Sequence, residues 1–476
     1  APGDVTGEAA QVGVGRVLGV GGLELTDLVG VGGVGPVEGV ALVGRRQVGA
    51  DDGLLDFVDG LVDRAGAVPL LVVCSARPEL LTRRSSWGGG KANAATISLA
   101  PLSNDDTSRL VAGLLSQAVL PAETQQTLLR RAEGNPLFAE EYVRMLRDRG
   151  LLRREGGVWR LEATGVDVPE TVQAIIAARL DALTPDEKSL LQDASVVGKV
   201  FWQSAVASLA GLSSWEVDEL LHGLERKELI RRERRASVAG ETEYAFRHVL
   251  VRDVAYGQSP RARRADVRER AAGWIEGLGE VRAEDRAEML AHHYLAAIEL
   301  LRATGRDVGT LQPRACAALC EAGDRAFALS ALESSAGAYR AALELMPPDD
   351  AARPGVLLRL GRSLFNWRNE GAEELREAAA AFVEAGDVES AGEAESLLGN
   401  VCWMSGAHAD ARAHHERAVE LVEGLPPTRT TAAIRGMRWR VLMLANEHPP
   451  LEEGEEILAL CESVGTTADI LHSRIN

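Results

Sequence analysis

Residues 311–347 read LQPRACAALCEAGDRAFALSALESSAGAYRAALELMP, two helical runs with Gly323 late in the first of them. The same small residue recurs as Gly361 and Gly399, at intervals of 38 residues. A fixed period of this length predicts helix pairs that stack on one another, because a single pair cannot bury its own apolar surface. We therefore expect a helical-repeat array over residues 281–476.

The first of these units resembles a tetratricopeptide repeat. Its residues Gly323, Tyr339, Ala342 and Pro347 fall where such a repeat has its small, aromatic, small and terminating residues. The resemblance implies that the pairs form a right-handed superhelix whose concave face binds a protein or peptide. A helical cap that binds nothing is the alternative, and self-association of the array is also left open.

Composition and charge narrow the class of protein. The 476 residues are 46% hydrophobic, 26% charged and only 4% aromatic, which is typical of a globular chain of about three domains and favours packed helices. A formal net charge of −18 repels phosphate backbones and anionic lipid, and so disfavours nucleic-acid and membrane partners. Because no apolar run reaches the ~18 residues of a membrane span and the five cysteines are scattered, we expect a cytoplasmic protein.

Residues 166–280 carry the signals of a winged-helix module. Thr184–Glu187 and Ser213–Glu216 have the residues of capping boxes, each of which opens a helix. The β-prone residues Leu229-Ile230 and Tyr244–Phe246, separated by a polar turn, then predict a β-hairpin. Helices followed by a hairpin are the pattern of a winged helix.

Residues 50–165 are expected to be the last part of an α/β domain followed by a helical lid. The apolar run Leu70–Val73 predicts a buried parallel strand, and Ile97–Leu99 predicts a second short strand. The preceding residues 1–49 contain 14 glycines, which disfavour a helix, and their valines show no alternation that would define strands. We expect that segment to be poorly structured or aberrant, either through a frame error in the gene or through natural divergence.

Several segments in this order resemble one family, the signal-transduction ATPases with numerous domains (STAND), a branch of the AAA+ P-loop ATPases. The segments that carry the resemblance are Ala50–Leu55, Leu71–Leu80, Ile97–Leu102, Glu133–Phe138 and Tyr244–Tyr256. They are similar to the ATPase-and-repeat half of bacterial regulators that also carry an adenylate/guanylate cyclase domain, of which this chain has no core. The family implies a predominantly α chain: the rest of an α/β P-loop ATPase domain, a winged helix and an α-solenoid of tetratricopeptide-like repeats.

The resemblance also implies a set of nucleotide-binding residues, with ATP or ADP and Mg²⁺ as the ligands of the family. The set consists of Asp51, Asp52, Arg77, Gly134, Asn135, Pro136 and His248. By this resemblance Arg77 senses a γ-phosphate, the segment at Asn135 packs against adenine, and His248 holds a diphosphate. Each has a purely structural alternative: a surface ion pair, a helix cap and a satisfied histidine, respectively.

The chain departs from the family where phosphate and metal are bound. A P-loop needs GxxxxGK[ST], but neither Gly90-Lys91 nor Gly198-Lys199 is followed by Ser or Thr. Arg45 and Arg46 stand where the family has two acids, and two cations cannot coordinate Mg²⁺. The sequence thus predicts no ATP hydrolysis by the family mechanism, no catalytic residues and no metal site.

Three functions remain after these exclusions. The first is a regulator in which a nucleotide-dependent switch is coupled to a protein-binding array. The second is a scaffold of helical repeats that binds proteins without nucleotide. The third, a winged-helix DNA reader based on the arginines at 231, 232, 234 and 235, is disfavoured by Glu233 and by the acidic total charge.

Overall fold

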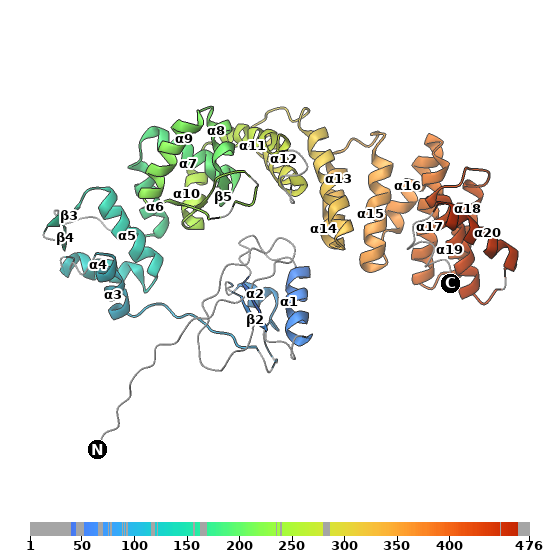
Figure 1. Cartoon of the computed structure of the whole chain (residues 1–476), viewed down its shortest axis with the longest axis horizontal. Helices are drawn as coiled ribbons and strands as arrows, with labels where there is room; N and C mark the ends of the chain where they lie inside the picture. Colours follow the sequence, from blue (N-terminus) through green and yellow to red (C-terminus); the bar gives the residue numbers. More distant parts are fainter. Residues whose placement is uncertain are drawn as a thin grey trace, which may run out of the picture. The chain divides into compact units, whose positions relative to one another are not determined.

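The structure is a computed structural model, and it describes part of the chain. The described residues are 40–43, 52–64, 70–74, 76, 79–87, 89, 91, 94–115, 120, 122–155, 158–161, 169–234, 236–238, 240–278, 286–447 and 449–464. The chain divides into two compact units, residues 1–100 and 101–476 (Figure 1). Most of the predicted Gly/Val-rich segment 1–49 lies outside the described residues.

The first unit contains a short β-α-β arrangement. Strand β1 (Val40–Val43) pairs in parallel with β2 (Leu70–Val73), and α1 (Asp52–Arg64) connects them. Helix α2 (Glu79–Arg83) follows. The parallel pairing of β2 confirms the prediction for that run, since a crossover helix is what joins parallel neighbours. The prediction of no strand within residues 1–49 is wrong at β1.

A second correction concerns residues Ile97–Leu99, which the sequence predicts as a strand. The structure gives them no regular secondary structure, and Ile97 and Leu99 are 83% and 93% exposed. An apolar triplet becomes a strand only when a neighbouring strand takes up its backbone hydrogen bonds. The described sheet of this unit has two strands, β1 and β2, and neither pairs with the triplet.

The second unit begins with the regions that the sequence predicts as a helical lid and as a winged helix. The lid contains α3 (Asn104–Leu114), α4 (Ala122–Ala132), α5 (Pro136–Asp148) and the hairpin of β3 (Leu152–Glu155) with β4 (Val158–Leu161). The winged helix contains α6 (Val172–Asp181), α7 (Pro185–Val197), β5 (Val200–Trp202), α8 (Gln203–Ala210), α9 (Ser214–Arg226), β6 (Ile230–Arg232), β7 (Glu243–Phe246) and α10 (Val249–Gln258). One hydrophobic core, from Val111 to Ala255, includes side chains on both sides of the predicted boundary at 165–166.

The two capping boxes and the hairpin that the sequence predicts for residues 166–280 are present. Thr184 and Ser213 each accept a backbone N–H from the third helical residue, and both capping boxes are complete. The predicted hairpin is present, with β6 antiparallel to β7. The structure adds β5 on the other side of β7, where the ring of Phe201 stacks on Tyr244. The sequence does not reveal β5, because three residues are too short for a periodic pattern.

Helices occupy the rest of the second unit. They are α11 (Arg261–Glu276), α12 (Arg286–Ala303), α13 (Gln312–Ala328), α14 (Leu332–Leu345), α15 (Arg353–Arg368), α16 (Ala372–Ala385), α17 (Val388–Met404), α18 (His408–Leu421), α19 (Arg429–Leu444) and α20 (Leu451–Val464). Each helix from α11 to α20 packs against the next one in chain order (Figure 1). The predicted fold class, predominantly α with stacked helical repeats, is confirmed.

The recurring glycines lie where paired helices cross. A Cβ atom added to Gly323 of α13 would lie 2.6 Å from the ring of Tyr339 of α14. A Cβ atom at Gly361 would lie 2.5 Å from the Leu375 side chain in the next pair. Real Cβ atoms do not approach this closely, so the missing side chain makes room for the large residue of the partner helix. This confirms that the period of the sequence is the period of the helix pairs.

Among the described helices, none is both long and apolar enough to cross a bilayer.

Candidate functional site

The structure describes four of the seven predicted nucleotide-binding residues with their side chains. Asp51 and Arg77 lie outside the described residues. Asp52 is the first residue of α1. The remaining four, Gly134, Asn135, Pro136 and His248, belong to the second unit, in the lid and the winged helix.

Gly134 and Asn135 together start helix α5. The Asn135 side chain accepts the N–H of Leu137 at 3.0 Å, and Pro136 occupies the first turn. Gly134 has a φ of +74°, and a Cβ atom there would lie 2.8 Å from the backbone nitrogen of Leu102. Leu102 in turn donates its N–H to the Gly134 carbonyl at 2.9 Å. The absence of a side chain at Gly134 therefore leaves room for the backbone of Leu102, and Asn135 serves as the N-cap of helix α5.

His248 lies beside the same lid helix. It is the N-cap residue of α10, and its Nε2 atom is 4.0 Å from Oε2 of Glu140, one turn beyond Pro136. Burial lowers the pKa of His248, and the charge of Arg144 lowers it further, although Glu141 partly opposes the shift. The imidazole is therefore neutral at pH 7. His248 therefore lies beside helix α5, which begins at Pro136.

A buried ion-pair network joins the lid to the winged helix, and sequence reasoning missed it. Arg179 of α6 is fully buried and donates to Glu141 of α5 at 2.5 Å, to Asp148 at 2.6 Å and to the Lys227 carbonyl at 2.5 Å. Glu141 is also fully buried and accepts from Arg144 at 2.8 Å. A buried guanidinium with three acceptors fixes the angle between these helices, because each hydrogen bond is directional.

The network continues through Glu228, which follows the end of α9. Its carboxylate accepts from Arg144 at 3.0 Å and from Arg147 at 3.4 Å. Burial alone would raise the pKa of Glu228, but the charges of Arg144, Arg147 and Arg247 outweigh it and lower the pKa. Helix α5 is therefore joined to the winged helix by two sets of ion pairs, one around Arg179 and one around Glu228.

The sequence did contain a signal for this network. Arg179 falls on the same helical face as Ile175, Ile176 and Leu180, which are all buried. A charged residue on an apolar face needs a buried partner of opposite charge, because an unpaired buried charge is very costly. The pattern predicts that a partner exists, but only the fold identifies it as Glu141.

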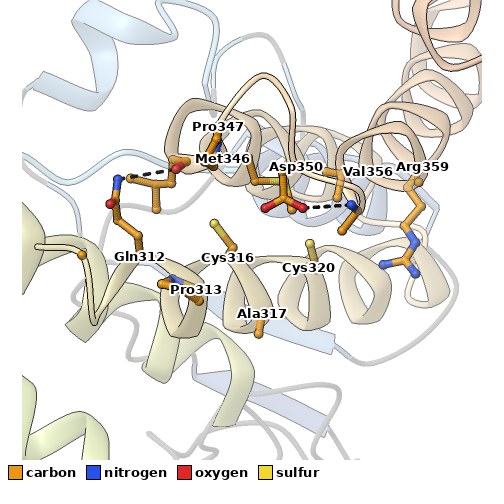
Figure 2. A pocket seen from close by; sticks show the side chains of 14 residues that line it. Gln312, Pro313, Cys316, Ala317, Cys320, Met346, Pro347, Asp350, Val356 and Arg359 are labelled. Atoms are coloured by element: carbon orange, nitrogen blue, oxygen red, sulfur yellow. Dashed lines mark hydrogen bonds between the residues drawn. The ribbon is translucent and has the colours of Figure 1, made fainter. Parts of the chain in front are cut away.

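The repeats contain a groove between α13, the end of α14 and the start of α15 (Figure 2). Its volume is about 510 Å³, and it is lined mainly by apolar and sulfur-containing side chains. The residues that line it include Gln312, Cys316, Cys320, Met346, Asp350, Gly355, Val356 and Arg359. Figure 2 shows Cys316 and Cys320 pointing from α13 into the space beneath Met346 and Asp350.

The polar groups of the groove lie at its ends. Gln312 donates to the Leu345 carbonyl at 3.5 Å at one end. At the other end Asp350 accepts the N–H of Ala352 at 2.8 Å, and Arg359 is near Asp324 at 3.3 Å. The middle, around Cys316 and Met346, is apolar. The groove is thus shaped to accept an apolar side chain with polar atoms on either side.

The two groove cysteines are neutral thiols. Burial raises the pKa of the Cys316 thiol and of the Cys320 thiol above the ordinary value. A thiol of raised pKa is a poor nucleophile and a poor metal ligand. Within the described part of the chain, no group of three or more His, Cys, Asp or Glu residues could hold a metal ion.

Comparisons with known proteins found one matching family model and a similar solved structure. The model of a domain of unknown function, DUF8739, matches residues 103–160, which run from α3 to β4. None of the curated proteins matches the chain. The crystal structure of a Signal Transduction ATPase with Numerous Domains protein with a tetratricopeptide repeat sensor, from Pyrococcus horikoshii, is similar over 91% of this chain and 69% of that chain. The identity is 13% and the TM-score 0.32.

Proposed function

We propose that the chain is a regulatory signalling protein whose helical repeats hold a segment of a protein partner. The observation that carries the proposal is the groove of about 510 Å³ between α13 and α15. Stacked helix pairs present such surfaces to extended or helical peptides, because each pair adds side chains without needing to rearrange its neighbours. The ordered network around Arg179 supports a second part, a lid and winged helix that move as one body.

The chemistry of the groove defines the partner segment. Cys316 and Met346 are soft, polarisable side chains, and the flexible methionine can adapt to a ligand of irregular shape, while Val356 adds a rigid apolar wall. Asp350 and Arg359 at one end offer one acceptor and one donor. We therefore expect a peptide with one large apolar anchor, such as Leu, Met or Phe, flanked by polar residues.

Gly355 provides a sharp test of this groove. It lines the groove, and a Cβ atom there would meet no atom within 4 Å, so a tryptophan side chain can leave the backbone at this position without a clash at its Cβ atom. Gly337 of α14 is equally open but does not line the groove, which makes Gly337→Trp the matched control. Both substitutions replace a glycine within a helix with tryptophan.

The experiment selects peptides from a displayed library on the full chain and measures their affinity for both variants. Gly355→Trp should weaken the selected peptides by about tenfold or more, the loss of one buried apolar anchor. Gly337→Trp should leave their affinity unchanged. If the selected peptides bind both variants with the same affinity as they bind the native chain, the binding surface lies elsewhere.

A second function is proposed for the lid and winged helix, a nucleotide-dependent switch of the STAND type. The position of His248 beside helix α5, whose first turn contains Pro136, favours it. Without a P-loop lysine the chain would hold ADP or ATP weakly, through the adenine-side segment and His248, with Mg²⁺ contributing little. Calorimetric titration of ADP into the full chain and into His248→Ala tests this, since equal heats from both would remove the histidine from the proposal.

The two alternative functions, a scaffold and a DNA reader, predict different ligands for the chain. A nucleotide-independent scaffold would bind peptide in the groove and give no heat with ADP. A winged-helix DNA reader would bind duplex DNA through Arg231 and Arg232, but Arg231 is already paired with Glu233 at 2.8 Å. The pairing lowers the charge available to a phosphate backbone.

A further inference from the structure

Three guanidinium groups surround one tyrosine ring where the winged helix meets the first helices of the array. The carbon at the centre of the Arg264 guanidinium lies 4.5 Å from the centroid of the Tyr256 ring. The corresponding distances are 4.9 Å for Arg252 and 5.7 Å for Arg268. Tyr256 and Arg252 belong to α10, and the other two arginines belong to α11. We call these four residues the Tyr256 cluster.

The positive charge of the Tyr256 cluster exceeds the negative charge of the carboxylates that pair with it. Arg252 pairs with Asp253 at 3.0 Å and donates to the Ser195 carbonyl at 2.9 Å. Among the described residues, neither Arg264 nor Arg268 forms an ion pair with a carboxylate. By contrast, the neighbouring Arg263 on the same helix is paired with Asp193 at 2.9 Å.

Two buried donors of the cluster are also unsatisfied. The Nε atoms of Arg264 and Arg268 are both shielded from solvent and have no hydrogen-bond partner among the described residues. Arg268 itself is only 4% exposed, although Lys and Arg are rarely buried without a partner. A buried guanidinium without a carboxylate partner is costly, since its charge and its unsatisfied Nε–H group have both lost water.

The histidine that touches Arg268 does not supply the missing charge. His293 Nδ1 lies 3.2 Å from Nη1 of Arg268. Burial, with the charge of Arg268, lowers the pKa of His293 to about 3, so its ring is neutral at pH 7 and accepts the hydrogen bond. Tyr256 shows the same excess of positive charge. Burial alone would raise its pKa, but Arg268 and Arg264 lower it.

We propose that the Tyr256 cluster is a binding site for a phosphate-type oxyanion, held by Arg264, Arg268 and Arg252. Planar guanidinium groups pair with the oxygens of phosphate in a two-pronged fork, which an ammonium group cannot do. The anion would neutralise the cluster and satisfy donors that the protein leaves unpaired. Arg252 and Arg264 are partly exposed, so an anion can enter from solvent, while Arg268 lies beneath them.

The site is distinct from the two surfaces described above. His248 caps the start of α10, while Tyr256 lies two turns further along that helix, and the groove involves α13 to α15. The phosphate could be free inorganic phosphate or the phosphate group of a nucleotide. An anion held between α10 and α11 would link the winged helix to the first helix that follows it.

The test uses the full chain in a buffer free of phosphate and sulfate, with calorimetric titration of sodium phosphate. Native protein should bind phosphate saturably at one site. Arg264→Gln, at a partly exposed position that tolerates a polar residue, should weaken binding about tenfold or more, the usual value of one charge-assisted hydrogen bond. Arg261→Gln is the matched control, because Arg261 is exposed on the same helix and lies outside the cluster.

Parallel titrations with ADP and with adenosine identify the source of the phosphate. If ADP binds more tightly than inorganic phosphate while adenosine does not bind, the ligand is a nucleotide phosphate, and equal affinities indicate free phosphate. In both cases Arg264→Gln must weaken the binding. The proposal is overturned if native protein shows no saturable binding at millimolar phosphate, or if Arg264→Gln binds as the native chain does. A preference for duplex DNA over phosphate at equal ionic strength would also overturn it.

Arg268→Gln gives an independent check with a different readout. Removal of a buried charge that has no carboxylate partner should raise the thermal midpoint in phosphate-free buffer, or leave it unchanged. Added phosphate should raise the midpoint of the native chain but not that of the variant. A variant that is destabilised in phosphate-free buffer, yet still responds to phosphate, would contradict the role of Arg268.

Discussion

The imidazole of His415 in α18 lies directly against Gly399 in α17. A Cβ atom added to Gly399 would lie 2.6 Å from Nε2 of His415, closer than a real Cβ contact. His415 is only 1% exposed, and both of its ring nitrogens lack a hydrogen-bond partner among the described residues. The third recurring glycine of the repeats thus accommodates a polar ring where the first two accommodate Tyr339 and Leu375. We therefore expect the stability of this pair of helices to depend both on side-chain volume at residue 399 and on pH.

Gly399→Leu should destabilise the repeats. The leucine would overlap His415 and force the two helices apart, at a typical cost of about 1–3 kcal/mol. Urea denaturation followed by circular dichroism measures the change. Gly337→Leu is the control, since its Cβ atom meets nothing within 4 Å, and it should leave stability unchanged or slightly raise it. Equal midpoints for the two variants would contradict the close crossing at Gly399.

Stability of the repeats should fall as the pH is lowered from about 6.5 to about 4. Burial, with the charge of His414, lowers the pKa of His415 to about 4, whereas the unfolded chain titrates near the ordinary value of about 6.5. Between these values the unfolded state binds a proton that the native state does not, so stability rises with pH there. The full effect is about 3 kcal/mol.

His415→Leu isolates this contribution. The variant should lose part of the pH dependence of unfolding between pH 4 and pH 6.5, because leucine has no proton to bind. The difference between the two curves is the relevant quantity, because other groups, such as His293, titrate in both proteins. Parallel curves for the native chain and the variant would show that His415 is protonated normally in the folded state.

Arg179→Met should be strongly destabilising. It leaves Glu141 buried with Arg144 as its single remaining partner, and loss of one member of a buried pair costs about 3–5 kcal/mol. The double variant Arg179→Met/Glu141→Leu should recover much of the loss, since it removes both charges. Arg109→Ala, at a 78% exposed side chain paired with Asp106, is the control and should change stability by less than about 0.5 kcal/mol. An additive double variant would argue against direct coupling of Arg179 and Glu141.

The chain should show no Mg²⁺-dependent ATPase activity. It lacks a P-loop, and the positions that would hold metal-binding acids are Arg45 and Arg46. A coupled assay on the full chain should give the rate of the buffer. Turnover clearly above buffer that is abolished by Arg77→Ala would show that another part of the chain supplies the phosphate cradle.

The sequence by itself determined where helices begin and how the repeats are spaced. Asn135, Thr184 and Ser213 cap their helices as the sequence predicts, because a cap is made by residues within three positions of each other. The glycine period likewise predicted the helix crossings, since the same local geometry repeats along the chain. The seven residues predicted to bind nucleotide were inferred from family resemblance alone, and one of them, His248, lies close to helix α5.

Only the tertiary structure decided which distant side chains meet. Glu141 and Arg179 are 38 positions apart, and the arginines of the Tyr256 cluster lie on two different helices. The groove at Cys316 and Met346 likewise exists only because α13 and the end of α14 pack together. Sequence patterns report which face of a helix is buried, because burial follows from periodicity. They do not report the rotation and offset between two packed helices, and those quantities decide which charge faces which.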